Sequence, residues 1–379
     1  MLIGGGGLIA ATAVLASWRA IETGMVLTDD AAFDPWQAWK QTAIGDPYAL
    51  VAAAILASSP HNTQPWLFKV TDRHIDVRAD PNRNLGAMDP FRREKWIGLG
   101  AAIANIEIAA PARGFVTRVQ LLPEASDPDL AARIFLQQGR AVPTALAAEI
   151  DQRRTNRSAY DRQRDLPASV IDSLLALDDD SVRTVWLPAT GASGTEFARE
   201  TLAATRLIVA DEEMSHDGHQ WFRSNPREVR LHRDGVATPT SGIPAWLARI
   251  SPLVPPVDAA GAGQYWLRST ERQLATAPRF GLILVRDLYD RKLQLLAGMR
   301  WQRMHLMLTA EGLAAHPMNQ LVEVVDRDRQ LKRHSATAQT LQAWTGRSEW
   351  RATFAFRTGY ATQAMPHSAR RGLAAVTVS

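Results

Sequence analysis

Three side chains that could bind a ligand stand together in the stretch ILASSPHNTQPW, which runs from Ile55 to Trp66. They are Asn62, Gln64 and Trp66, and they follow an apolar run directly. Amide side chains both donate and accept hydrogen bonds, so they can bind a ring edge that carries alternating C=O and N–H groups. The stretch therefore indicates a site for a flat heteroaromatic ligand. A helix cap followed by a turn, with Trp66 in the core, explains the same residues as well.

A second motif, RRTNR, supplies positive charge. Arg153, Thr155 and Arg157 place two guanidinium groups and a hydroxyl group in one short run. Guanidinium groups bind phosphate through paired hydrogen bonds, so the motif predicts a phosphate site. The alternative is a group of solvated arginines on a surface helix. Arg370 and Arg371, near the C-terminus, support the phosphate site if the fold brings them close to the motif.

Composition excludes several other kinds of chemistry. The chain has 379 residues and is 46% hydrophobic, which is enough for a folded core in two domains or in one duplicated unit. Its 43 basic and 39 acidic residues are interspersed, so we expect no nucleic-acid partner. Cysteine is absent, which excludes disulfides and cysteine nucleophiles. His216 and His219 lack an evident third ligand, and there is no Gly-x-Ser-x-Gly motif, so we predict neither a metal site nor a catalytic side chain.

The N-terminal sequence MLIGGGGLIAATAVLASWRA contains an apolar run of about sixteen residues, which is shorter than the roughly 20 that a membrane-spanning helix needs. Its length is typical of the apolar region of a signal peptide, although no basic region precedes it. We expect residues 1–24 to form a signal-like or tethering segment, and the protein to be exported or membrane-associated. The alternative is a flexible or packed N-terminus of a cytoplasmic protein.

Apolar spacing predicts alternating helices and strands. Helical spacing runs over residues 36–58, with a turn at Gly45-Asp46-Pro47, and a helix over 89–115 begins with Asp89 as its cap and Pro90 at its first position. Further helices are expected at 141–154, 166–180, 195–214 and 291–313, and strands at 66–70, 74–80, 115–123, 132–139, 182–188 and 279–287. Residues 216–266, rich in Trp, Pro and Gly, read as a long irregular stretch. Such loops are usually lids or linkers, and the alternative is an insertion packed on the far side of the fold.

Two of these helices resemble each other. Setting Arg93 against Arg291 aligns Gly100 with Gly298, and a predicted strand precedes each helix. The pattern favours an internal duplication, in which the two long helices pack at the centre and their glycines permit close approach. A chance match between two core helices is the alternative, because apolar helical spacing is common.

Four stretches together resemble a known family. SSPHNTQPW is similar to the signature of the nitroreductase superfamily, whose members bind FMN, and RRTNRSAY resembles that family's phosphate-binding arginine motif. TAEGLAAHPMNQ resembles the segment that passes the flavin ring, and RTGYATQAMPHSARR resembles the C-terminal end. The resemblance covers about residues 48–375. It implies an α+β fold, the nitroreductase-like three-layer sandwich.

The order of these motifs resembles the double-length branch of the family. In ordinary members the arginine motif opens a chain of about half this length, and a homodimer builds each flavin site from both subunits. Here the motif lies in the second half of the chain. The resemblance therefore implies a pseudo-dimer made of residues 25–150 and 151–379, with a lid-like insertion at about 216–266 and one FMN per chain. We expect a monomer or a higher homo-oligomer of such units.

The resemblance also implies roles for individual residues. Where the family usually has Pro-Ser, this chain has Ser58-Ser59-Pro60, which makes the contacts of that segment less secure. The implied FMN-binding residues are Arg153, Thr155 and Arg157 at the phosphate, with help from Arg370 or Arg371; Ser58, Ser59, Asn62 and Gln64 at the ring or the ribityl chain; and the backbone of Glu311 and Gly312 at the reactive N5 edge.

The activity implied by the resemblance is an FMN-dependent NAD(P)H oxidoreductase. Hydride would pass from NAD(P)H to flavin N5 and then to a small aromatic acceptor, such as a nitroaromatic or a quinone, and no side chain need act as a base. The alternative is a lidded FMN-binding or sequestering protein with little turnover. If no flavin binds, the sequence favours an α+β protein that binds an anionic ligand.

Overall fold

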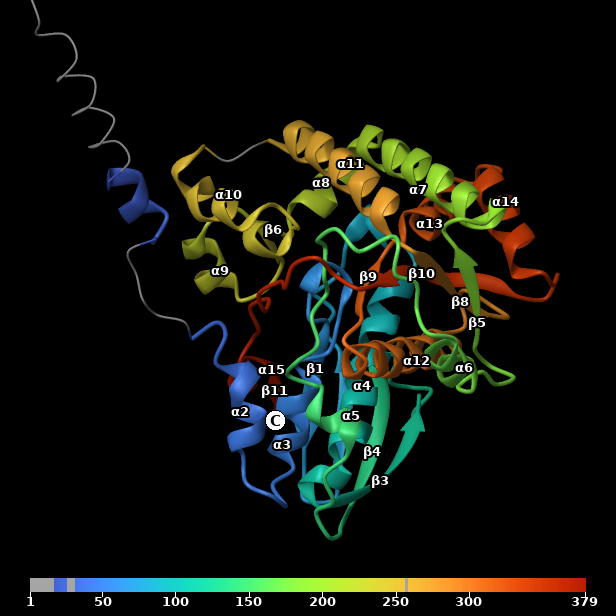
Figure 1. Cartoon of the computed structure of the whole chain (residues 1–379). Helices are drawn as coiled ribbons and strands as arrows, with labels where there is room; N and C mark the ends of the chain where they lie inside the picture. The colour runs from blue at the N-terminus through green and yellow to red at the C-terminus, as the bar shows by residue number, and fades with distance from the viewer. Residues whose placement is uncertain (1–16, 26–30, 256–257) are drawn as a thin grey trace, which may run out of the picture.

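The computed structural model describes residues 17–25, 31–255 and 258–379, and within them two larger β-sheets flank a pair of long helices (Figure 1). The first sheet has the strand order β11-β1-β2-β4-β3, and its neighbours are antiparallel except for the parallel pair β1 and β11. Its strands are β1 (Trp66–Val70), β2 (His74–Ala79), β3 (Phe115–Leu121), β4 (Leu130–Gln138) and β11 (Thr377–Val378).

The second sheet is antiparallel throughout and has the order β5-β8-β10-β9. Its strands are β5 (Arg183–Pro188), β8 (Arg279–Val285), β9 (Ala314–Pro317) and β10 (Arg351–Gly359). The six strands predicted from the sequence are all present, with ends shifted by a few residues, and β9, β10 and β11 are additional. The predicted α+β class is confirmed.

The helix pair consists of α4 (Arg93–Ala109) and α12 (Arg291–Ala310), the two helices that the sequence aligns with each other. Helix α4 packs on β2 and β4 of the first sheet, while α12 packs on β8, β9 and β10 of the second. Each helix also completes the opposite core, since Leu295 and Leu306 of α12 lie in the core of the first sheet and Ile97 of α4 lies in that of the second. The order of layers is therefore sheet, helix pair, sheet.

Two glycines set the distance between these helices. A Cβ atom on Gly100 would lie 2.1 Å from the carbonyl oxygen of Leu295, and one on Gly298 would lie 1.9 Å from that of Ile97. Both obstacles are backbone atoms, which cannot move aside as a flexible side chain can. The reciprocal contact is what an internal duplication predicts, and the duplication itself remains an interpretation.

The start of α4 differs from the prediction. The helix begins at Arg93, because Arg92 has a left-handed backbone (φ 59°) that ends the preceding turn. Asp89 nevertheless satisfies the first turn, since its carboxylate accepts hydrogen bonds from the backbone N–H groups of Glu94 (3.1 Å) and Lys95 (2.9 Å). Asp89 was correctly predicted to cap the helix. The helix itself was predicted to begin at Pro90, and it begins at Arg93.

The segment from 216 to 266 is not irregular as predicted. It contains the end of α8 (Glu212–His219), β6 (Phe222–Arg223), α9 (Pro226–His232), β7 (Val236–Ala237), α10 (Ala245–Ile250) and the start of α11 (Ala259–Thr276), drawn in yellow and orange in Figure 1. Short capped helices explain the error: Asn225 caps α9 with Pro226 at its first position, and Asp258 caps α11. Pro226 and Pro244 stand at the starts of α9 and α10, so proline in this segment does not exclude helices.

The C-terminal part of the chain joins both halves. Helices α13 (Gln320–Gln330) and α14 (Ala336–Thr345) pack with the second sheet, whereas α15 (Leu373–Val376) and β11 return to the first. In β11, Thr377 lies beside Phe68 of β1. The predicted division at residue 150 therefore separates the two larger sheets except for this last strand.

The remaining helices are α2 (Pro35–Gln41), α3 (Tyr48–Ala54), α5 (Ala145–Ala148), α6 (Ala168–Leu175) and α7 (Ala192–Ala210). Of the predicted signal-like segment, residues 1–16 lie outside the described part of the chain. In residues 17–25, the carbonyl group of Thr23 accepts a hydrogen bond of 2.9 Å from the backbone N–H of Arg227. None of the helices in the described residues is long and apolar enough to cross a membrane.

Candidate functional site

Two adjoining cavities open where the two halves of the chain meet. The larger one, here called the main cavity, shares Ser58, Ser59, Thr155, Arg157 and Val236 with a smaller one, here called the arginine pocket. Other residues of the arginine pocket are Trp36, Asn62, Arg153, Arg154, Thr240, His367 and Arg370. Others of the main cavity include Met88, Glu94, Ile97, Trp301, His316, Asn319, Gln320, Glu323 and Phe354, and, from the 216–266 segment, Gly218, His219, Phe222, Tyr265 and Trp266.

Buried arginines dominate the arginine pocket. Arg153 and Arg370 are each 2% exposed, and in the described chain neither has a carboxylate partner. Arg153 donates from Nη2 to the carbonyl oxygen of Leu56 (2.9 Å), while its Nε and Nη1 have no hydrogen-bond partner among the described residues. Burial, with a smaller contribution from Arg154, lowers the pKa of Arg153 to about 9. A buried cation with free N–H groups is costly unless a ligand pairs with it, so the pocket is suited to an anion.

Arg370 is oriented by three neighbours. Its Nη1 donates to Oδ1 of Asn62 (2.8 Å), its Nη2 donates to the carbonyl oxygen of Ala57 (3.3 Å), and its guanidinium lies 4.6 Å from the ring centroid of Trp36. Its Nε is unpartnered among the described atoms, and burial followed by repulsion from Arg153 holds its pKa well below the usual range. The fold thus brings the C-terminal arginine to the arginine motif, as the phosphate site requires.

Thr155 and Arg157 lie where the two cavities meet. Arg157 donates from Nη1 to the carbonyl oxygen of Thr240 (3.1 Å), which belongs to the 216–266 segment. Burial is the main cause that lowers its pKa, to about 10. A ligand that spans both cavities would therefore pass beside this guanidinium group.

The side-chain amides of Asn62 and Gln64 form hydrogen bonds with groups of the protein itself. Asn62 donates to the carbonyl oxygens of Gly235 (3.1 Å) and Ala369 (3.0 Å), and it accepts from Arg370. Gln64 donates to the carbonyl oxygen of Arg233 (2.8 Å) and lies outside the lining of both cavities. The structure therefore does not support the interpretation that these amides bind a ring edge. They hold a strained turn, in which both have positive φ (55° and 51°), against the 216–266 segment.

Ser58 and Ser59 line both cavities, as the resemblance implied. The hydroxyl of Ser58 donates to Oε1 of Gln302 (3.1 Å) and accepts from Nε1 of Trp301 (3.0 Å), so α12 fixes a residue of the first half. The hydroxyl of Ser59 accepts from the backbone N–H of Gln64 (3.0 Å). The departure from the family's Pro-Ser pattern leaves both serines at the cavity wall.

Besides Gln64, three further predicted site residues are not brought to either cavity. Glu311 and Gly312 lie exposed at the C-terminal end of α12, and Arg371 pairs with Asp80 at 3.4 Å. The segment that does reach the main cavity begins a few residues later, at His316. His316 is the third residue of β9 (Ala314–Pro317), and these four residues were not predicted as a strand.

Several lining residues were missed from the sequence. His61, His316, Asn319 and Gln320 stand at cavity walls. All four lie in the stretches SSPHNTQPW and TAEGLAAHPMNQ, which carry the family resemblance, but none of them was singled out. His316 accepts at Nδ1 from Nε of Arg357 (3.2 Å), which leaves the proton of its neutral ring on Nε2. Burial and nearby arginines lower the pKa of both histidines, that of His61 to about 4. Both rings are therefore neutral around pH 7.

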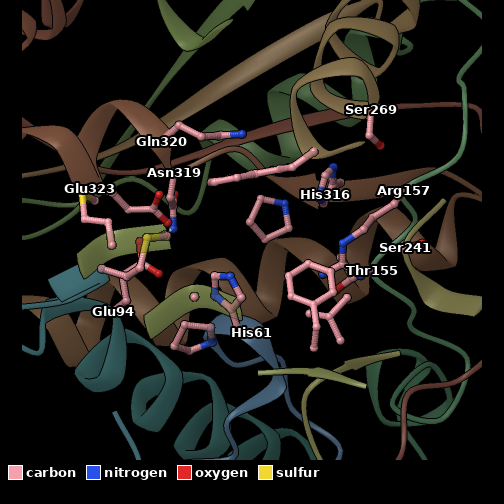
Figure 2. A pocket seen from close by; sticks show the side chains of 18 of the residues that line it. His61, Glu94, Thr155, Arg157, Ser241, Ser269, His316, Asn319, Gln320 and Glu323 are labelled. Carbon is pink, nitrogen blue, oxygen red and sulfur yellow. Dashed lines mark hydrogen bonds between the residues drawn. The ribbon is translucent and has the colours of Figure 1, made fainter. Parts of the chain in front are cut away.

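One end of the main cavity carries carboxyl groups, away from the arginines (Figure 2). Glu94 of α4 and Glu323 of α13 are each 5% exposed, and Nδ2 of Asn319 donates to Oε1 of Glu94 (2.9 Å). Burial raises the pKa of Glu94 to about 8, and burial together with repulsion from Glu94 raises that of Glu323 well above its usual range. This end of the cavity therefore holds protons at neutral pH.

Glu94→Gln tests this proton directly. Folding raises the pKa of Glu94 from about 4.5 to about 8. Between these two pH values the folded protein keeps a proton on Glu94, whereas the unfolded chain has lost it. The free energy of unfolding of the wild type therefore falls as the pH rises through that range. The variant has no such proton, and we expect it to gain stability over the wild type between pH 5 and pH 8, by an amount on the order of a few kcal/mol.

Thermal unfolding of both proteins at the two pH values measures this gain. The matched control is Glu311→Gln, which removes an exposed carboxylate and should show the same small difference at both. A Glu94→Gln difference that does not change with pH would mean that Glu94 is ionised in the folded protein.

Comparison with known proteins adds independent information. No family model matches the chain. A Mycobacterium tuberculosis (strain ATCC 25618 / H37Rv) protein named "Putative NAD(P)H nitroreductase Rv3131" is 28% identical over 282 residues, which cover 73% of this chain and 76% of the relative. Another from the same strain, named "Putative NAD(P)H nitroreductase acg", is 31% identical over 116 residues, covering 29% of this chain and 34% of the relative.

Solved structures of similar fold include the FMN-dependent nitroreductase NfnB from Mycobacterium smegmatis in complex with NADPH, at a TM-score of 0.38 and 17% identity. That match covers 62% of this chain and 97% of the other. A nitroreductase with bound FMN from Bacteroides fragilis matches at a TM-score of 0.35 and 12% identity, over 62% of this chain and all of the other.

Proposed function

The sequence relatives confirm the resemblance to the nitroreductase family, and from this premise we propose that the chain is an FMN-dependent NAD(P)H oxidoreductase. The observation that carries the proposal is the arginine pocket. Arg153, Arg157 and Arg370 converge on it, and the free N–H groups of Arg153 and Arg370 are buried without a carboxylate. Such a set of donors is suited to the terminal phosphate of FMN.

The residues present fit the rest of this cofactor. A ligand whose phosphate is bound by Arg153 and Arg370 would pass Thr155 and Arg157 to enter the main cavity. There the walls are largely apolar and aromatic, with Trp301 among them, which is suited to a flat ring. When bound, FMN would supply hydride transfer between NAD(P)H and an acceptor.

The protein's own contribution would be binding, orientation and exclusion of water. Buried arginines hold the phosphate, neutral His61 and His316 offer hydrogen bonds without added charge, and Trp266 and Phe222 shield the cavity from solvent. A flat acceptor such as a nitroaromatic or a quinone suits these walls.

A second candidate, a lidded protein that binds FMN with little turnover, is favoured by one observation. The 216–266 segment lines the main cavity with His219, Phe222 and Trp266, so it is not an insertion on the far side of the fold. It is held down by hydrogen bonds from Asn62 to Gly235 and from Arg157 to Thr240, and by the pairing of Asp234 with Arg83 (2.8 Å). A segment fixed in this way could close off the flavin from a large reductant.

Anaerobic absorbance spectroscopy decides between the two candidates. We expect the purified protein to show flavin bands that bleach promptly on addition of NADPH or NADH. Dithionite, which is small, serves as the control because it should bleach a lidded flavin as well. Bleaching by dithionite but not by either nicotinamide would favour the lidded protein. Absence of flavin bands, with no FMN bound on reconstitution, would refute both.

A further inference from the structure

The acidic end of the main cavity has two buried hydrogen-bond acceptors without partners among the described atoms. Oε2 of Glu323 and Oε1 of Gln320 have no partner among the described atoms, although both side chains are only 5% exposed and both line the cavity. The amide of Asn319 satisfies one oxygen of Glu94. Buried acceptors without partners are costly, so the free oxygens of Glu323 and Gln320 favour a ligand group that donates hydrogen bonds to them.

The same end also has an excess of negative groups. Behind Glu94 and Glu323 lie Asp89 and Asp326, and Arg93 is the cation in the described part of the chain whose charge acts on both glutamates. Two nitrogens of Arg93 are committed elsewhere, since Nε donates to Asp326 (2.7 Å) and Nη1 donates to the carbonyl oxygen of Thr353. Its Nη2 stays 3.7 Å from Glu94, beyond hydrogen-bond distance, and has no hydrogen-bond partner among the described atoms.

Other neighbours do not offset these charges. The hydroxyl of Tyr289 donates to Asp326 (2.9 Å), and Lys95 donates from Nζ to the carbonyl oxygen of Asp80. Arg327, on the same helix as Glu323, pairs instead with Asp211 (2.8 Å). The carboxyl groups at the cavity wall are thus left for protons or for a ligand.

The walls beside these carboxyl groups are apolar. Met88, Met214, Ile97 and Trp266 line the same cavity, and Figure 2 shows Glu94 and Glu323 at the end of it that is remote from Arg157. A ligand that fits both features has a flat apolar body and a positively charged nitrogen group.

We infer that Glu94, Gln320 and Glu323 form a subsite for the cationic nitrogen group of an aromatic ligand, such as an amidinium or an aryl-linked ammonium. The inference rests on the proposed function, since it names the class of small aromatic molecule that the cavity selects. The charged nitrogen donates to the free oxygens of Glu323 and Gln320, and its charge replaces the protons that these carboxyl groups otherwise hold. Acceptors or inhibitors with a cationic arm are preferred over neutral ones of the same size.

Isothermal titration of the purified protein tests the subsite with two probes, benzamidine and benzyl alcohol, which are similar in size and differ in charge. We expect benzamidine to bind at least about tenfold more tightly at pH 7.5. Its affinity should rise between pH 6 and pH 8, because the probe stays protonated while the carboxyl groups lose their protons. Titrations in phosphate and in Tris should show a proton released on binding.

Glu323→Gln should reduce benzamidine affinity about tenfold and leave benzyl alcohol unchanged, and Glu311→Gln, on the exposed end of α12, should change neither. Equal affinity of the wild type for the two probes would overturn the inference without any variant. So would unchanged benzamidine binding in a folded Glu323→Gln protein. Neither titration requires turnover, so the two proposals can fail separately. If the protein binds benzamidine more tightly than benzyl alcohol but binds no FMN, the proposed function is wrong and the cationic subsite is still supported.

Discussion

Arg153→Met is expected to weaken FMN binding by about 10- to 150-fold while it stabilises the protein without cofactor. The loss follows from removal of a charged hydrogen bond to phosphate, worth about 1.5–3 kcal/mol. The gain follows because Arg153 is a buried cation with two unpartnered nitrogens, which methionine replaces with an apolar side chain of similar length. Flavin fluorescence titration measures the affinity, and thermal unfolding of the apoprotein measures the stability.

Opposite signs of the two effects are the informative result. The matched control is Arg162→Met, an exposed arginine that lines neither cavity and should change neither quantity appreciably. Unchanged flavin affinity in Arg153→Met would place the phosphate elsewhere. A less stable apoprotein would show instead that the hydrogen bond from Arg153 to Leu56 contributes more to the fold than the buried charge costs.

Gly298→Ala is expected to destabilise the whole molecule by about 3 kcal/mol, even though alanine favours a helix over glycine by about 1 kcal/mol. The added methyl group would lie 1.9 Å from the carbonyl oxygen of Ile97, so α4 and α12 would have to separate. Since both sheets pack on this helix pair, their separation loosens both cores. The midpoint of urea unfolding, followed by far-UV circular dichroism, measures the loss.

Two further alanine variants make the result specific. Gly218 is also helical, and a Cβ there would come no closer than 3.7 Å to Met88, so Gly218→Ala should be neutral or slightly stabilising. Gly100→Ala should match Gly298→Ala in size, because its Cβ would meet the backbone of Leu295 in the reciprocal contact. Full stability of Gly298→Ala would contradict the close packing, and unequal losses at the two glycines would weaken the duplication.

Sequence reasoning was most successful where the signal is local. Strands such as 66–70 and 279–285 were recognised because apolar and β-branched residues are concentrated in them. The arginine motif was found because Arg153 and Arg157 stand close together in the chain, and the structure places both at one pocket. The paired glycines of α4 and α12 were visible as a repeat.

Errors arose where several local explanations compete. The Pro, Gly and Trp content of residues 216–266 read as a loop, while caps such as Asn225 start short helices there. Glu311 and Gly312 were assigned to the flavin by resemblance alone, and the chain reaches the main cavity only within β9, at His316. Asn62 and Gln64 were read as ligand-binding amides, and their partners turned out to be backbone groups of distant segments.

By itself, the sequence determined most of the helices and strands outside residues 216–266, and the short motif that supplies Arg153 and Arg157 to the arginine pocket. Only the tertiary structure decided that Arg370 joins Arg153, that the 216–266 segment lines the main cavity, and that Glu94 and Glu323 meet at its far end. The reason is physical. Helical and strand periodicity is a property of neighbouring residues, whereas burial, loss of hydration and repulsion between like charges arise only when segments distant in the chain are packed together.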